Sequence, residues 1–257
     1  MIFLGPAGSQ GLGNEEGLKK TSSMGLKRYE VEFTHGVNMK NEMAKKIGKL
    51  TDTLEIKPSI HAPYFINLAS KEKEKIIASK KRILDSCERG HHLGVKKIVF
   101  HAGFFQGREQ KEVYDMIKKE LIDLQETIKS KGWLVKLAPE VTGKPSQFGS
   151  LEELMRLRKE INISYCVDFA HLYARQQGKI DYDTVLKSIP DKEFHAHFSG
   201  INYGPKGEKN HEIVNIEQFK KLAKAIEKAK KTVTIINESP NIFGDLEKMQ
   251  KALTQIA

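Results

Sequence analysis

Residues 57–69 read KPSIHAPYFINLA and place a histidine, a proline and a tyrosine at the end of a short apolar run. The run over residues 58–61 is continuous rather than alternating, which is typical of a strand that is buried on both faces. A lone histidine at the tip of such a strand is more often a hydrogen-bonded structural residue than a ligand. Its meaning therefore depends on whether other strands of the chain end in the same way.

Short runs of this kind recur along the chain, with amphipathic segments between them. There are eight, at residues 2–4, 29–33, 58–61, 97–101, 134–139, 164–168, 194–198 and 233–237. The segment 113–128 between two of them carries apolar residues on one helical face, and Gly94 and Gly132 stand where helices are expected to end. Eight strand–helix units predict an α/β fold, a single (β/α)8 TIM barrel spanning residues 1–257 as one domain.

An open, doubly wound sheet is the alternative architecture. Such a sheet should show a glycine-rich phosphate loop after its first strand. Residues 4–13, LGPAGSQGLG, contain glycines but lack a G-x-G-x-x-G pattern with an acidic partner at the expected distance. The pattern therefore favours the closed barrel.

The chain carries 43 Lys and Arg against 33 Asp and Glu, a net charge of +10. A basic surplus fits a polyanionic partner such as DNA, but the lysines alternate with glutamates, as in KEKEKIIASKKR, which is typical of solvated helix faces. Charge alone leaves both interpretations open.

The sequence lacks a membrane-spanning apolar stretch and a signal-like beginning, which predicts a cytoplasmic protein with no membrane partner. The two cysteines, Cys87 and Cys166, lie in apolar contexts and are expected to be reduced core residues.

Residues of metal-ligand type stand at the ends of six consecutive predicted strands or in the loops that follow them. They are His61, His101, Glu140, Asp168, His171, His195, His197, Glu208, His211 and Glu238. A barrel brings these strand ends together at one mouth, and buried carboxylates and imidazoles are costly unless they are paired or bound to metal. A set of this kind without cysteine suits zinc, manganese or iron, and it is too large for one tetrahedral ion. We therefore expect two or three metal ions, which suits hydrolysis of a phosphate ester.

With these residues in view, the chain resembles the endonuclease IV family, the zinc-dependent apurinic/apyrimidinic endonucleases with a xylose isomerase-like barrel. The resemblance runs almost end to end. It rests on SIHAPYFINLAS, VFHAGF, LAPEVTGKPSQFGSLEEL, CVDFAHLYARQQG, HAHFSGINYG, GEKNHEIV and INESP, in that order. The overall pattern is similar to the compact, archaeal-type members.

The resemblance implies an enzyme that uses three zinc ions to cleave double-stranded DNA on the 5′ side of an abasic site. It implies zinc ligation, with manganese as the alternative metal, by His61, His101, Glu140, Asp168, His171, His197 and Glu238. Glu140 would bridge two ions and be the catalytic residue. Tyr64 and Phe65 match loop residues that press into the duplex as the abasic nucleotide is flipped out.

The chain departs from the family pattern at three places. The family has an aspartate and a histidine two residues apart after strand 7, with a basic residue between them. Here Glu208 and His211 are three apart and Lys209, the matching DNA contact, lies between them. His195 is an additional imidazole, expected to support a ligand. The loop over residues 33–40, FTHGVNMK, lacks an arginine for probing DNA.

Two other functions remain open from the sequence. A sugar isomerase or epimerase of the same superfamily needs one or two metals, for which Glu140, Asp168, His197 and Glu238 would suffice, with the two glutamates moving a proton between adjacent carbons. The other histidines of the set and the basic surface favour the nuclease. The third possibility, a nucleic-acid-binding barrel without catalytic activity, is disfavoured, because burying carboxylates that have no function costs free energy. In the absence of a dimerisation signal, we expect a monomer.

Overall fold

Eight parallel strands close into a barrel in the computed structural model, which describes residues 1–256. One half has the strand order β1 (Ile2–Pro6), β12 (Thr232–Asn237), β9 (Glu193–Phe198) and β8 (Cys166–Asp168). The other has the order β2 (Arg28–Glu32), β3 (Lys57–His61), β4 (Lys97–Phe100) and β6 (Lys136–Pro139). Single bridges, Ala7 with Glu30 and Glu140 with Cys166, join the halves at both seams. The predicted barrel is confirmed.

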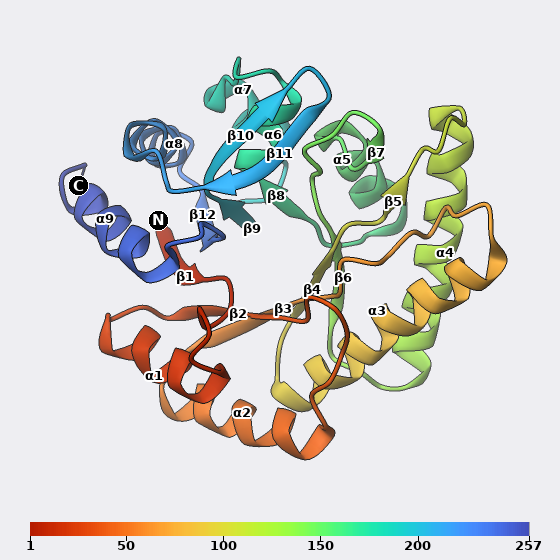
Figure 1. Cartoon of the computed structure of the whole chain (residues 1–257), viewed down its shortest axis with the longest axis horizontal. Coiled ribbons are helices and arrows are strands. Elements are labelled where there is room, and N and C mark those ends of the chain that lie inside the picture. The colour runs from red at the N-terminus through yellow and green to blue at the C-terminus, as the bar shows by residue number, and fades with distance from the viewer. Residues whose placement is uncertain (257) are drawn as a thin grey trace.

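Helices surround the strands (Figure 1). They are α1 (Asn14–Ser23), α2 (Asn41–Thr53), α3 (Lys73–Leu93), α4 (Gln110–Ser130), α5 (Leu151–Ile161), α6 (Phe169–Arg175), α7 (Tyr182–Ser188), α8 (Ile216–Lys228) and α9 (Ile242–Thr254). Two short helices, α6 and α7, together connect β8 to β9. Every other connection around the barrel contains one helix.

Local sequence signals account for several helix ends. Gly94 follows α3 in the left-handed conformation, with φ of 82°, so the missing side chain lets the chain turn into β4. At the start of α5, the Ser150 side chain accepts the backbone N–H of Glu153, while the Glu153 carboxylate accepts the backbone N–H of Ser150. This capping box satisfies two backbone donors that the helix would otherwise leave free.

Two small antiparallel sheets extend the carboxyl end of the barrel. The smaller pairs β5 (Gly103–Phe104) with β7 (Gln147–Phe148), which come from different connections, and the larger is a hairpin of β10 (Gly200–Gly204) and β11 (Gly207–Glu212). Figure 1 shows the larger one as the pair of blue arrows beside β9. The segment after β9 was expected to be a loop, but it forms this hairpin, which places Glu208 and His211 on a strand.

The core lies between strands and helices and includes the fully buried Phe100, Phe169 and Phe219. Cys87 and Cys166 are buried and unbonded to each other, as expected. Within residues 1–256, no helix combines the length and the apolar character that crossing a membrane requires.

Candidate metal centre

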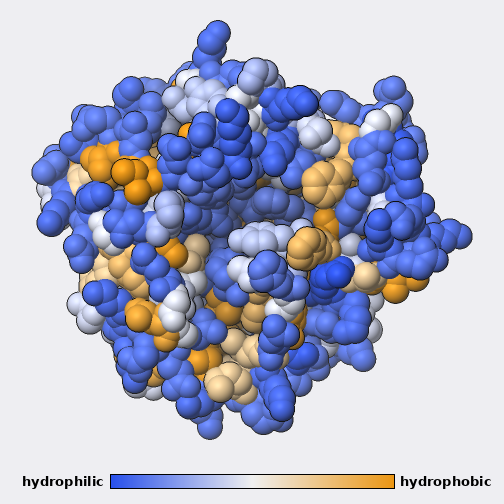
Figure 2. Space-filling view, viewed as in Figure 1, coloured by the Kyte–Doolittle hydropathy of each residue, from blue (hydrophilic) through white to orange (hydrophobic). Residues whose placement is uncertain are grey.

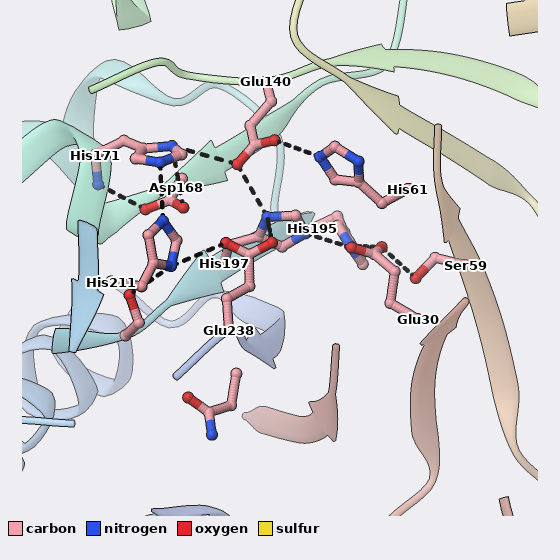
Figure 3. A network of polar contacts seen from close by, with 12 residues as sticks. Glu30, Ser59, His61, Glu140, Asp168, His171, His195, His197, His211 and Glu238 are labelled. Atoms are coloured by element: carbon pink, nitrogen blue, oxygen red, sulfur yellow. Dashed lines mark hydrogen bonds and ion pairs between the residues drawn. The ribbon is translucent and has the colours of Figure 1, made fainter. Parts of the chain in front are cut away.

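Glu140, directly after β6, is the centre of a buried cluster at the carboxyl ends of the strands (Figure 3). Its Oε2 lies 3.0 Å from His61 Nε2 and 3.1 Å from His101 Nε2. Its Oε1 lies 2.9 Å from His197 Nδ1 and 3.5 Å from His171 Nδ1. One carboxylate that is 1% exposed thus faces imidazoles from four strands or the segments that follow them.

A second group forms where β8 runs into α6. Asp168 caps α6 by accepting the backbone N–H of His171 at 2.7 Å, and its other oxygen lies 3.2 Å from His171 Nδ1. The far nitrogen of His171, Nε2, lies 3.2 Å from His211 Nε2 and 3.5 Å from Glu208 Oε2. The β10–β11 hairpin therefore delivers both of its predicted residues to the cluster.

Glu238 closes the set from the end of β12. Its two oxygens lie 3.2 Å from His197 Nδ1 and 3.7 Å from His211 Nδ1. Three of the five groups whose ligand atoms all lie within 4.8 Å of one another consist of predicted ligands alone: His61, His101 and Glu140; Asp168, His171 and His211; and Glu140, Asp168, His197 and Glu238. The structure brings all nine predicted ligands together, and their ligation of metal stays a prediction.

The donor set fits divalent cations. Imidazole and carboxylate groups without thiolate suit zinc and manganese. Oδ2 of Asp168 is buried with no hydrogen-bond partner, as expected of an oxygen that a cation would satisfy. The buried clusters therefore indicate divalent metal sites.

The members of the cluster perturb one another strongly. Burial would raise the pKa of Glu140, but His197 and His101 outweigh it and hold that pKa well below its usual range. Burial would lower the pKa of His61, but the hydrogen bond to Glu140 and the charge of Glu32 raise it to about 10. For Asp168, burial dominates and raises the pKa to about 7. The cluster thus favours positive charge, whether as protons on imidazoles or as bound cations.

A polar layer inside the barrel lies directly beneath this cluster, where barrels of this kind usually carry branched apolar side chains. Glu30 Oε1 lies 2.6 Å from His197 Nε2. Its Oε2 accepts a hydrogen bond from Ser59 at 2.6 Å and lies 3.0 Å from His195 Nε2. Since Nε2 of His197 faces Glu30, Nδ1 is left facing the cluster. His195 therefore supports a candidate ligand through Glu30, in agreement with the expectation.

Glu30, Glu32 and Ser59 were missed in the sequence. The signal was the stretch YEVE in β2, where two carboxylates two residues apart must share one face of a buried strand. His35, His91 and His92, which were left out of the predicted set, belong to none of the donor groups found in residues 1–256.

A cavity of about 660 Å³ opens above the cluster. Its lining includes His61, His101, His171, Glu208, His211 and Glu238 on one side and residues from the ends of β1 and β2 on another. The surrounding face is mostly hydrophilic and hollowed near its centre (Figure 2). Tyr64 lines the cavity and is 53% exposed, and Phe65 is 63% exposed. Lys209 lies exposed on β11.

A family model described as a xylose isomerase-like TIM barrel matches residues 18–255. The chain belongs to this family. An uncharacterised protein of Methanocaldococcus jannaschii is 34% identical over 246 residues, covering 91% of this chain and 89% of its own. A protein of Metamycoplasma arthritidis named "Probable endonuclease 4" is 26% identical over 140 residues, covering 52% of this chain and 49% of its own. The chain thus spans about half the length of that relative.

Two solved structures show the same fold. A D-tagatose 3-epimerase-like protein superposes with a TM-score of 0.75 at 18% identity, covering 99% of this chain and 96% of its own. Endonuclease IV from Thermus thermophilus superposes with a TM-score of 0.69 at 19% identity, covering 99% and 98%. Family membership and the buried donor groups together indicate a metal-dependent enzyme of the xylose isomerase-like superfamily.

Proposed function

We propose that this protein is a metal-dependent phosphodiesterase that cleaves double-stranded DNA on the 5′ side of abasic sites. The observation that carries the proposal is the size of the donor set. Eight of the nine predicted ligands form three overlapping groups, in which Glu140 and Asp168 each belong to two, and Glu208 lies 3.5 Å from His171. Sites with several metal ions suit phosphate ester hydrolysis, because charge develops on both the attacking and the leaving oxygen.

The chain's own residues have distinct parts in this proposal. Bound divalent ions would supply an activated water and charge stabilisation for the phosphate. Glu140 links two parts of the donor set, because one of its oxygens faces His61 and the other faces His197. Tyr64 and Phe65 offer exposed rings that can fill the space left in a duplex by an extruded nucleotide.

Charge and similarity also support the proposal. The net charge of +10 favours a polyanionic substrate, and Lys144 and Lys209 lie at the cavity and on the neighbouring hairpin. Partial sequence similarity extends to proteins named as probable endonuclease 4.

The test is nicking of a duplex with one abasic site, labelled on either strand, beside an undamaged duplex. The wild-type protein should cut only the abasic strand, 5′ to the lesion, and Glu140→Gln should reduce the rate at least about 100-fold. Absence of cleavage by folded protein loaded with zinc or manganese would reject the proposal.

One observation favours a second candidate, a sugar epimerase. Glu140, Asp168, His197 and Glu238 form a four-donor group on their own, which suffices for one ion. In that case one of Glu140 and Glu238 would remove a proton from a ketose carbon next to the carbonyl group, and the other would return a proton to the opposite face of the same carbon. His61→Ala separates the two candidates, because it should abolish nicking but leave epimerisation of a ketohexose measurable.

A further inference from the structure

Glu32 is a half-buried acidic residue that the proposed chemistry leaves unused. It ends β2, beside His61 in the register of β2 and β3. Its Oε1 is buried and has no hydrogen-bond partner in the protein. Burial raises the pKa of this carboxyl to about 8. A buried polar atom without a hydrogen bond costs free energy. Oε1 of Glu32 is therefore expected to bond to a group of a bound ligand, because the protein supplies no partner.

Glu32 is one of the residues that line the cavity above the cluster. The loop after β1 crosses its stem at Gly8, where φ is 73° and an added Cβ would lie 3.2 Å from Glu32 Cγ. The stem of Glu32 is thus held in place at the edge of the space that a substrate would enter.

A metal ion is a poor explanation for Glu32. Its acidic neighbours within ligand distance are Glu30 and Glu238. Glu30 is already engaged by Ser59, His195 and His197, and Glu238 faces His197 and His211. Because Glu30 supports His197 and Glu238 belongs to the donor cluster, Glu32 has no separate set of co-ligands of its own.

The residues of the cavity wall limit which kind of ligand group can contact Glu32. Lining residues from the ends of β1 and β2 are Ala7, Gly8, Ser9, Gln10, Gly11, Glu32 and Thr34. Glu32 is the acidic residue among them, and a carboxyl group offers a phosphate no positive charge. A phosphate therefore belongs on the side of the donor cluster, and the group that meets Glu32 is an uncharged hydrogen-bond donor.

We propose that Glu32 determines substrate specificity by accepting a hydrogen bond from a sugar hydroxyl. This inference rests on the proposed function. In its cyclic form the deoxyribose of an abasic site carries a hydroxyl at C1′ where the base has been lost. That hydroxyl is absent wherever a base is present. Glu32 would therefore recognise the abasic sugar and not the phosphate next to it.

The experiment compares two duplexes, one with a natural abasic site and one with a tetrahydrofuran residue, which lacks the C1′ hydroxyl. The wild-type protein should show kcat/KM at least about tenfold higher for the natural site, because the tetrahydrofuran residue leaves a buried acceptor without a hydrogen bond. Glu32→Leu should remove that preference by slowing cleavage of the natural site while leaving tetrahydrofuran cleavage within about twofold. Glu32→Gln, which keeps an acceptor oxygen, should retain part of the preference.

Controls separate this role from folding and metal binding. Glu126→Leu, at an exposed position on the outer helix α4, should keep the wild-type ratio. Glu32→Leu should also keep the metal content and thermal unfolding of the wild type. An unchanged ratio in Glu32→Leu, or loss of one metal equivalent, would overturn the inference while leaving the proposed function intact. Failure of the wild type to cleave either duplex would instead overturn the proposed function and this inference with it.

Discussion

At the scale of single residues, His61 gives a direct test of the donor cluster. Its Nε2 lies 3.0 Å from Glu140, and its group contains only His101 and Glu140 besides itself. His61→Ala should therefore lose about one metal equivalent per chain and its nicking activity, because two donors hold an ion poorly. Metal analysis after dialysis checks this, with circular dichroism to show an intact barrel. Unchanged metal content would contradict the assignment.

Glu30 offers a test of the layer beneath the cluster. Glu30→Gln places an amide where His197, His195 and Ser59 now meet a carboxylate. The affinity for metal should fall about 10–100-fold, as is typical when the partner of a ligating histidine is changed. Competition with a chromogenic chelator measures this. Ser59→Ala, which removes one donor to Glu30 and leaves both histidines in place, should have a smaller effect, and equal effects would argue against the orientation of His197 by Glu30.

The candidate ligands were predictable because the ends of parallel strands in a barrel meet at one mouth. That rule alone identifies His61, His101 and Glu140 as neighbours although they span 79 residues. Glu30 was not predictable in the same way. A glutamate within a strand occupies an interior or an exterior face, and sequence periodicity does not say which face of β2 lines the barrel.

At the scale of elements, the seam between β1 and β2 depends on Gly5. A Cβ at this position would lie 2.4 Å from the carbonyl oxygen of Arg28, in the backbone of the neighbouring strand. Gly5→Ala should therefore destabilise the protein by about 2–3 kcal/mol, because the strands cannot approach. Thermal unfolding should show a fall of roughly 5–10 °C. At Gly36 the nearest atom would be 4.0 Å away, so Gly36→Ala should unfold within about 2 °C of the wild type.

The strands and long helices follow from hydrophobic periodicity, but the β10–β11 hairpin does not. Its strands contain Asn202, Glu208, Lys209 and Asn210, which lack the alternation of a half-buried sheet. The hairpin is held by pairing across its own turn and by packing on α6, so tertiary contacts rather than local propensity decide it.

At the scale of the whole molecule, the charges of the cluster make stability depend on pH and metal. In the metal-free protein the pKa values of His61 and His171 are raised to about 10, since carboxylates outweigh the effect of burial. Folding thus favours their protonated forms, and this stabilisation is complete below pH 6.5 and is lost as the pH rises through 10. The pKa of Glu32 is raised from 4.5 to about 8, so folding also favours its protonated form. The stabilisation from this group is lost as the pH rises from 4.5 to 8.

The Tm of the metal-free protein should therefore fall by at least about 5 °C between pH 7 and 9.5. Zinc-loaded protein should show a smaller fall over this range, because a bound cation replaces the protons on the imidazoles. Calorimetry on chelator-treated and reloaded samples checks both statements. A metal-free Tm that is constant or rises over this range would contradict the charge balance described for the cluster.

The pairing of β1 with β12 sets an order of events during synthesis of the chain. Strand β1 leaves the ribosome before the other strands of the barrel, yet the partner on one of its edges, Thr232–Asn237, is the last of the barrel strands to emerge. Until then that edge has unpaired backbone groups, which invite pairing with other chains. Glu238 follows β12 directly, so the ninth donor arrives at the moment the barrel closes. Closure of the barrel and completion of the donor set are therefore one event, and a nascent chain cannot acquire the full metal complement before it.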